Sequence, residues 1–283
     1  MQSKDMKIKS IFLDGQMVKA RMELIDSLLP GVVAGKGVFE TMRVYNGKVF
    51  SLDKHFDRLF RGLRLLKIRP SYSKRQMEIY LDRTIKANLL KEARIRLSVW
   101  KEKRQLRIAV VCQDIGRSWV KKDQKGIRAI VSNVIRKKTP FSNIKSVEYH
   151  CFRRAFNEAK EKGCDEAILL NHRQEIVEGS RTNIFYIRKG TLYTPMVKCG
   201  CLNGITRQIV IQLARKLKIP IRVVAANIQM LLRSNEAFVT NSLIGIVPLV
   251  VVSNQMIGQG KVGPLTKKFM DAYNTNVHSS CLV

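Results

Sequence analysis

The spacing of apolar residues predicts helices and strands in the N-terminal part of the chain. One face of the segment from Asp53 to Leu66 is apolar and carries Phe56, Leu59, Phe60, Leu63 and Leu66. This period predicts an amphipathic helix with Asp53 as its N-cap. A second helix is expected from Ser73. Strands are expected at 7–12, 38–44, 94–100 and 106–111, with an Asn46-Gly47 hairpin turn after the second of them.

Short apolar runs and amphipathic segments continue after residue 126. The expected strands are 127–134, 166–171, 183–187, 221–224, 236–240 and 249–252. Helices are expected at 146–162, 207–218 and 264–273, the first ended by Gly163 as its C-cap residue. We therefore predict the α+β fold class. The predicted parts are an N-terminal α+β domain (1–113), a polar interdomain linker (114–126) and a C-terminal domain (127–283).

Length and composition agree with two domains. The 283 residues, 45% of them hydrophobic, can bury a sizeable core, and a domain typically takes roughly 150 residues. No run approaches the roughly 20 apolar residues of a membrane span. The N-terminus lacks the apolar region of a signal peptide. The expectation is a soluble, cytoplasmic protein without a membrane partner.

Cysteine and histidine do not form a metal-binding pattern. Six cysteines are scattered, and Cys199-Gly200-Cys201 is a close pair without a second pair or a histidine cluster. The four histidines are dispersed, and His55 is expected to pack locally near Arg58 without a catalytic role. We therefore expect no metal site, and we expect the thiols to be reduced.

Three segments supply a lysine, a carboxylate and an anion site. Lys145 offers an amine that can hold an aldehyde, and Glu178 offers a carboxylate that can keep a pyridine nitrogen protonated. Gly204-Ile205-Thr206 precedes an amphipathic run, so Thr206 is expected at a helix N-terminus, which binds phosphate readily. Each pattern is common when taken alone. Together they are the groups that a pyridoxal phosphate enzyme needs.

An ordered set of motifs resembles the class IV aminotransferases, the pyridoxal phosphate fold type IV family. This family includes branched-chain aminotransferases, D-amino acid aminotransferases and aminodeoxychorismate lyases. The matching segments are Gly37–Glu40, Arg43–Gly47, His55–Leu59, Lys145, Gly163–Ala167, Glu178, Asn183–Phe185, Thr194-Pro195, Gly204–Arg207, Thr240–Ser242 and Gly263–Thr266. So many matches in order are more specific than any local pattern. The resemblance implies two domains, a smaller N-terminal α/β domain and a C-terminal distorted barrel.

The resemblance also implies pyridoxal 5'-phosphate as the cofactor and gives roles to matching residues. Lys145 matches the Schiff-base lysine, and Glu178 matches the partner of the pyridine nitrogen. Tyr149 matches the tyrosine that hydrogen-bonds the ring oxygen of the cofactor, and these three are the implied catalytic residues. The positions that match the phosphate-holding residues are Arg58, Ile205 through its backbone, Thr206 and Ser242.

The chain departs from the family pattern at three places. Lys36 replaces the carboxylate of Gly-Asp-Gly before Val-Phe-Glu, and Glu148 stands where an asparagine usually follows the lysine. The Ala-Asp-Glu-Val-Phe pattern is Ser-Asn-Glu-Ala-Phe at 234–238. None of these changes removes a group implied to be catalytic.

The substrate signatures are incomplete. Branched-chain aminotransferases tend to carry Phe-Glu-Gly-Ile-Arg where residues 39–43 are Phe-Glu-Thr-Met-Arg. D-specific enzymes use an Arg-x-His pair after the strand that here ends at Glu102. We expect ping-pong transfer of an amino group between an amino acid, of branched-chain type, and a 2-oxo acid, in a homodimer. The alternatives are an aminodeoxychorismate lyase and a D-amino acid aminotransferase. The expected substrate side-chain contacts are Val32, Val33, Val38 and Phe39.

The charge points to a different class of protein. Lys and Arg number 52 against 22 Asp and Glu, a formal net charge of +30 that would suit a nucleic-acid partner. The basic residues are spread along the chain without a nucleic-acid fold signature, so we expect a solvated basic surface that attracts anionic substrates. The non-enzymatic alternative is a basic nucleic-acid-binding protein on a retained fold. Lys145 and Glu178 argue against it, because a binding module does not need them.

Overall fold

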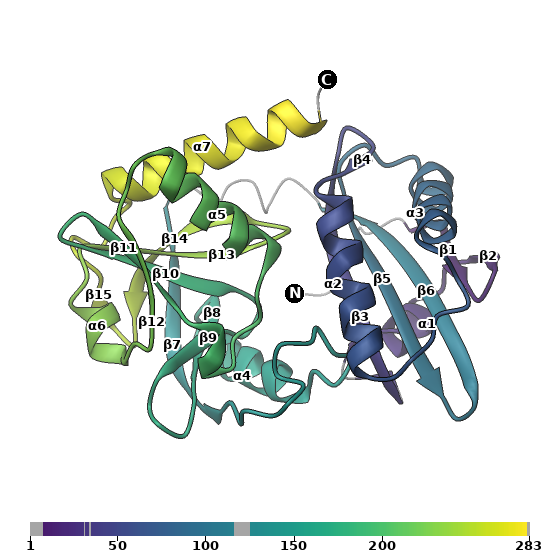
Figure 1. The fold of residues 1–283 in the computed structure, drawn as a ribbon, viewed down its shortest axis with the longest axis horizontal. Coiled ribbons are helices and arrows are strands. Elements are labelled where there is room, and N and C mark those ends of the chain that lie inside the picture. Colours follow the sequence, from purple (N-terminus) through teal and green to yellow (C-terminus); the bar gives the residue numbers. More distant parts are fainter. Residues whose placement is uncertain (1–7, 31, 34, 116–124, 282–283) are drawn as a thin grey trace. The chain divides into compact units, whose positions relative to one another are not determined.

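The computed structural model describes residues 8–30, 32, 33, 35–115 and 125–281. The chain divides into two compact units (Figure 1). Unit 1 comprises Met1–Gly116, Ile144–Tyr149 and His278–Val283, and unit 2 comprises Arg117–Asn143 and His150–Val277. Most of the expected linker lies outside the described residues. The expected C-terminal domain began at residue 127, yet the segment with Lys145 belongs to unit 1.

Unit 1 is built on a six-stranded sheet in the order β2-β1-β6-β5-β3-β4. Its strands are β1 (Ser10–Leu13), β2 (Gln16–Lys19), β3 (Lys36–Tyr45), β4 (Lys48–Val49), β5 (Ala93–Glu102) and β6 (Gln105–Asp114). Its helices are α1 (Met22–Ser27), α2 (Leu52–Leu65) and α3 (Lys74–Asn88). The apolar face of α2, including Phe56, Leu59 and Leu63, packs in one core with Val38 and Met42 of β3. The predicted helix after residue 53 therefore has the predicted buried face.

The starts of α2 and α3 differ in how well the sequence predicts them. Ser73 caps α3 through a capping box, in which its side chain accepts from Gln76 N and the Gln76 side chain accepts from Ser73 N. The N-cap of α2 is Ser51, in left-handed backbone (φ 54°), and it makes no side-chain cap bond. Asp53 lies in the first turn instead, where a carboxylate still favours the helix dipole. The prediction of Asp53 as N-cap is thus wrong.

Unit 2 contains a nine-stranded sheet in the order β12-β11-β10-β13-β14-β7-β8-β9, with β15 also paired to β14. Its strands are β7 (Ile127–Ile135), β8 (Glu166–Leu170), β9 (Ile176–Gly179), β10 (Asn183–Arg188), β11 (Thr191–Pro195), β12 (Ile221–Val224), β13 (Glu236–Asn241), β14 (Gly245–Val252) and β15 (Gln255–Met256). Its helices are α4 (His150–Glu161), a short 3-10 helix (Val197–Cys199), α5 (Ile205–Lys216), α6 (Ile228–Leu232) and most of α7 (Pro264–Cys281). The mixed helices and strands of both units confirm the α+β prediction.

Two helices of the C-terminal half have bounds that the sequence does not predict. The helix expected from residue 146 begins at His150, because the backbone before it pairs with β3. It ends as expected, with Gly163 at φ 67°. Helix α7 continues to Cys281, past the expected end at 273. No helix in the described ranges has the length and apolar character needed to cross a membrane.

Candidate active site

Lys145 lies on the edge of β3 in unit 1. Phe39 N donates to Lys145 O at 2.9 Å, Val147 N donates to Gly37 O at 3.0 Å, and Ser146 forms a bridge with Val38. Among the strands, β4 pairs only with Val44 and Tyr45 at the end of β3, so the first part of β3 has β5 on one side, and residues 144–147 pair with it on the other side. These backbone bonds fix the position of the lysine on a rigid sheet.

The side chains of Lys145 and Tyr149 meet at one aromatic ring. Lys145 Nζ is 4.5 Å from the centroid of the Phe39 ring, within cation–π range. The Tyr149 ring contacts Phe39 edge to face, with 5.5 Å between centroids. Phe39 is 4% exposed. The ring therefore aligns both predicted catalytic groups of unit 1. Lys36 and Glu148, the two charged departures from the family pattern, are both exposed.

A buried charge cluster forms around Glu40, the residue that follows Phe39 on β3. Arg58 of α2 donates through Nε to Glu40 Oε1 at 2.7 Å and through Nη2 to Oε2 at 2.6 Å. His55 Nδ1 lies 2.7 Å from Glu40 Oε2. Glu40 and His55 are each 1% exposed. His55 thus lies beside Arg58 as expected, but both residues meet on a carboxylate to which the sequence assigned no role.

The cluster holds its carboxylate ionised and its histidine neutral. Burial raises the pKa of Glu40, but the Arg58 charge and the hydrogen bonds from Arg58 and His55 outweigh it and hold that pKa at about 2. Burial lowers the pKa of His55 more than the bond to Glu40 raises it, with Arg58 and Lys145 lowering it further. Neutral His55 then carries its proton on Nδ1 and donates to Glu40.

The side chain of Arg96 on β5 is a buried cation, and two of its donors meet no acceptor among the described residues. Its Nε and Nη2 are buried and have no partner. Burial, with a smaller contribution from Arg94, lowers its pKa to about 9. Arg96 pairs in register with Thr41 of β3, so the two side chains lie on the same face of the sheet. Thr41 is two residues from Phe39, so Phe39 shares that face as well. An anion on this face would satisfy those donors.

Glu178 of β9 is the buried carboxylate of unit 2. It is 5% exposed, and Oε2 accepts from Leu202 N at 3.1 Å. Burial and the nearby charge of Glu178 raise the pKa of Cys201 to about 12, so this thiol stays protonated. Arg207 fixes the same loop, with Nη2 donating to Pro195 O at 2.9 Å and Nη1 donating to Asn203 Oδ1 at 3.1 Å. Glu178 is therefore joined to the loop that leads into α5.

The N-terminus of α5 is open to an anion. Its N-cap is Gly204, which has no side chain to cap the helix. A Cβ at Gly204 would overlap Asn183 Oδ1, so a larger residue there would displace the Asn183 side chain. Ile205 and Thr206 are buried at the first turn. The backbone N–H groups of such a turn favour negative charge.

Ser242 lies in the turn between β13 and β14. Asn241 Oδ1 accepts from Leu243 N at 2.9 Å and from Ile244 N at 3.0 Å, which shapes this turn. Thr240 pairs with Asn183 across the sheet, and its buried Oγ1 has no hydrogen-bond partner among the residues that the structure describes. Since Asn183 also adjoins Gly204, the turn with Ser242 and the start of α5 belong to one corner of unit 2.

The structure thus divides the predicted residues between the two units. Arg58, Lys145 and Tyr149 lie in unit 1, and Glu178, Ile205, Thr206 and Ser242 lie in unit 2. Sequence patterns assign no role to Glu40, Arg96 or Thr240. The available signal was weak, a single polar residue within an apolar strand. In the described ranges, His, Cys, Asp and Glu form no group suited to a metal ion.

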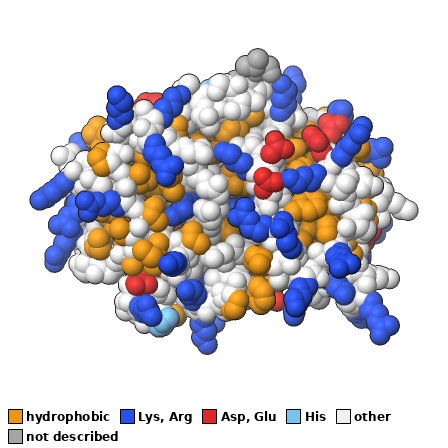
Figure 2. Space-filling model, viewed as in Figure 1, with side chains coloured by type: hydrophobic (Ala, Val, Ile, Leu, Met, Phe, Trp, Pro, Cys, Tyr) orange, Lys and Arg blue, Asp and Glu red, His pale blue; other side chains and the backbone are white. Residues whose placement is uncertain are grey.

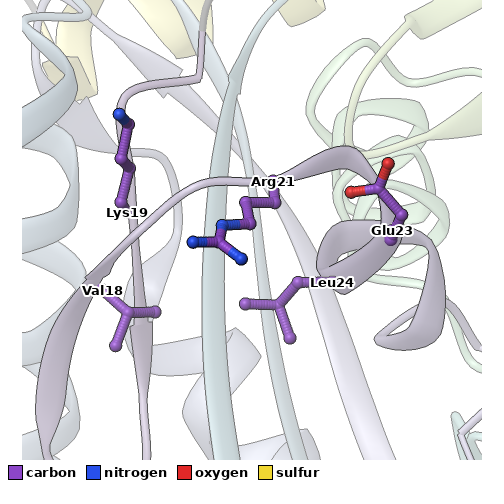
Figure 3. A pocket seen from close by; sticks show the side chains of 5 residues that line it. All are labelled: Val18, Lys19, Arg21, Glu23 and Leu24. Carbon is purple, nitrogen blue, oxygen red and sulfur yellow. The ribbon is translucent and has the colours of Figure 1, made fainter.

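Two surface features lie apart from these residues. A hollow of about 560 Å³ is lined by Val18, Lys19, Arg21, Glu23 and Leu24 (Figure 3). It contains no predicted site residue, and three of its five lining side chains are charged. Figure 2 shows Lys and Arg side chains spread over the visible face rather than gathered in one patch. Neither feature competes with the candidate site.

Comparison with known proteins identifies the class. The family model for amino-transferase class IV matches residues 37–252. A putative branched-chain-amino-acid aminotransferase of Methanocaldococcus jannaschii is 32% identical over 273 residues, covering 93% of this chain and 94% of that one. A D-alanine aminotransferase of Listeria monocytogenes is 26% identical (96% and 97% covered), and an aminodeoxychorismate lyase of Bacillus subtilis is 27% identical (88% of each). The solved T.th. branched-chain amino acid aminotransferase with pyridoxamine 5'-phosphate has a TM-score of 0.87, 25% identity, and coverage of 98% and 96%.

The chain belongs to the class IV aminotransferases. Enzymes of this class use pyridoxal phosphate, and the protein is a pyridoxal phosphate-dependent transaminase. The fold, enzyme class and cofactor that the sequence predicted are therefore confirmed.

Proposed function

We propose that this transaminase moves the amino group of a branched-chain amino acid to a 2-oxo acid, with Lys145 as the catalytic amine. The observation that carries the assignment of Lys145 is its place on the edge of β3, with Nζ over the Phe39 ring and the Glu40–Arg58 cluster one residue away. The substrate class rests on the relative from Methanocaldococcus jannaschii, whose name gives that class.

The residues present fit pyridoxal phosphate. Arg58 in unit 1 is a donor that suits a phosphate dianion, and in unit 2 the uncapped start of α5 at Ile205 and Thr206 and the hydroxyl of Ser242 are of the same kind. The buried Thr240 hydroxyl, which has no partner, lies at the same corner of unit 2 as the start of α5. Glu178 supplies a buried carboxylate for the pyridine nitrogen, and Tyr149 a phenol for the ring oxygen.

The chain's own groups have distinct tasks in the reaction. When bound, the cofactor supplies an electron sink for the bonds at the substrate Cα. The Lys145 amine would hold the cofactor and would move the proton at that Cα. Glu178 keeps a proton on the ring nitrogen. Arg96, whose buried donors lack a partner, would hold a carboxylate of the substrate.

The apolar substrate contacts predicted from sequence need revision at one position. Phe39 faces Lys145, which suits a substrate side chain beside the reacting carbon. Val38 instead packs in the core of unit 1 at 1% exposure, so it does not contact substrate. Val33 packs against a second apolar cluster of unit 1, and Val32 is 47% exposed.

Two further expectations remain proposals. A homodimer is expected from the family resemblance, and a cytoplasmic location agrees with six free cysteines, five of them buried.

An absorption titration of the purified protein tests the proposed function. L-Leucine, L-isoleucine or L-valine should convert the visible cofactor band to the pyridoxamine form, and 2-oxoglutarate should restore it. Borohydride reduction followed by peptide mapping should place the cofactor on Lys145. Cycling with D-alanine while L-leucine is inert would move the protein to the D-specific branch. Pyruvate release from aminodeoxychorismate, without an amino-acid half-reaction, would make it the lyase.

A further inference from the structure

The guanidinium of Arg58 is held in a fork by one buried carboxylate. Both Nε and Nη2 donate to Glu40, at 2.7 and 2.6 Å, and the Arg58 side chain is 11% exposed against 1% for Glu40. A bidentate arginine–carboxylate pair fixes the plane of the guanidinium as well as its position. The orientation of Arg58 is therefore set from within unit 1.

The fork leaves a defined set of donors unused. A guanidinium has five N–H groups, and the pair with Glu40 occupies one on Nε and one on Nη2. The remaining donors lie mainly on Nη1, on the edge of the plane away from Glu40. A tetrahedral dianion needs donors in such a fixed geometry, whereas a freely rotating cation offers only its charge.

Glu40 is itself held from a second side. Its Oε2 receives Arg58 Nη2 and also lies 2.7 Å from His55 Nδ1. Because burial keeps His55 neutral, the ring donates from Nδ1 and adds no charge. Two residues of α2, three positions apart, thus grip one carboxylate of β3.

We propose that Glu40 is a positioning residue that orients Arg58 toward the phosphate of the cofactor, and that His55 fixes Glu40 in turn. The inference rests on the proposed function, in which Arg58 binds that phosphate. Glu40 never touches the cofactor in this scheme. Its own negative charge opposes the dianion, so charge and orientation predict opposite effects when it is removed.

The opposite signs give a direct test. Dissociation constants are measured for pyridoxal 5'-phosphate and for pyridoxal, which lacks the phosphate, with the wild-type chain and with E40Q. If orientation dominates, E40Q raises the dissociation constant of pyridoxal 5'-phosphate by about tenfold or more and changes that of pyridoxal by less than about twofold. The ³¹P NMR shift of the bound cofactor should move as well. H55Q should give a smaller loss in the same direction.

Matched variants separate orientation from charge and folding. E92Q removes the half-exposed carboxylate that pairs with Arg43 at 3.0 Å, the same charge change away from Arg58, and should leave both constants unchanged. In an R58Q background, E40Q should have no further effect on phosphate preference. If E40Q does not fold, E40D carries the test, because it keeps the charge and shortens the side chain that makes the fork.

The outcomes distinguish the two proposals. Equal or tighter binding of pyridoxal 5'-phosphate by folded E40Q or E40D, with normal binding by the wild type, overturns the positioning role alone. A similar loss for pyridoxal also overturns it, since the effect would then not pass through the phosphate. A wild-type chain that binds no cofactor overturns the proposed function and this inference together.

Discussion

The groups proposed for function differ in kind between the two units. In unit 1 they are side chains: Lys145 beside the edge of β3, Tyr149 against the Phe39 ring, and Arg58 on α2. Unit 2 presents mainly backbone donors and turns, at the start of α5 and in the turn with Ser242, together with buried Glu178. A side chain can be removed cleanly by mutation, whereas a backbone donor can be disturbed only through its neighbours. Mutations of Lys145 or Tyr149 should therefore act on chemistry, whereas mutations of Arg58 and of most of the proposed positions in unit 2 should act on cofactor retention.

The largest expected effect is that of K145A. In the proposed mechanism, loss of the amine removes both the covalent attachment and the proton transfer, so kcat/KM should fall on the order of 10⁴-fold or more. Steady-state and single-turnover kinetics measure this loss. K36A, which removes an exposed cation at the start of β3, is the matched control and should stay near the wild-type rate.

E178Q should be the exception in unit 2, because the proposed role of the Glu178 carboxylate is in the chemistry. An amide cannot keep the ring nitrogen protonated, so kcat should fall on the order of 10²-fold while the cofactor remains bound. Turnover and the visible spectrum of the same sample check this. Unchanged turnover would contradict the catalytic role and leave Glu178 with a structural role, that of accepting a hydrogen bond from Leu202 N.

T206A should show the behaviour expected of unit 2. Loss of a hydroxyl at the start of α5 should weaken cofactor binding by about tenfold and leave the rate of the saturated enzyme nearly unchanged. Equilibrium dialysis with added cofactor measures this. T275A, which removes an exposed helical hydroxyl that donates to Asp271 O, is the control. A lower rate at saturation with normal affinity would contradict the assignment to the phosphate.

Acid should destabilise unit 1 through its charge cluster. The folded pKa of His55 lies below its ordinary value of 6.5, so only the unfolded chain takes up this proton as pH falls through 6.5, and stability is lost. Glu40, held at about 2, loses its stabilising contribution between about 4.5 and 2. Urea unfolding between pH 7.5 and 5 should show a loss on the order of 1 kcal/mol. H55Q should flatten that slope, and a slope that H55Q leaves intact would exclude His55 as its source.

The smallest effect should be that of salt on association. Each chain carries a formal charge of +30, so two copies repel, and screening should tighten the proposed dimer as ionic strength rises. Sedimentation at several salt concentrations measures this. A fully active monomer in about 0.15 M salt would contradict the dimer.

Structure that depends on neighbouring residues can be predicted from this sequence, whereas pairings between distant segments cannot. The α3 start is readable because Ser73 and Gln76 complete one motif within four residues. The segment after Ile144 has a helical pattern, but its first residues pair with β3, about a hundred positions earlier in the chain, and no local pattern reports this. The burial of Arg96 could not be predicted for the same reason, since it depends on which strands flank β5. The assigned roles of Lys145 and Glu178 come from the ordered motifs and remain to be tested.

The pairing of residues 144–147 with β3 also sets an order for folding during synthesis. An N-terminal chain that ends near residue 115 has every strand of the six-stranded sheet but leaves part of one edge of β3 unpaired, next to Phe39. That edge is closed only when about thirty more residues have left the ribosome, roughly two to six seconds at common translation rates. Until then the nascent chain presents unpaired backbone groups, which favour association with other strands. Nascent chains arrested before residue 144 should therefore bind chaperones more strongly than chains arrested well beyond residue 149.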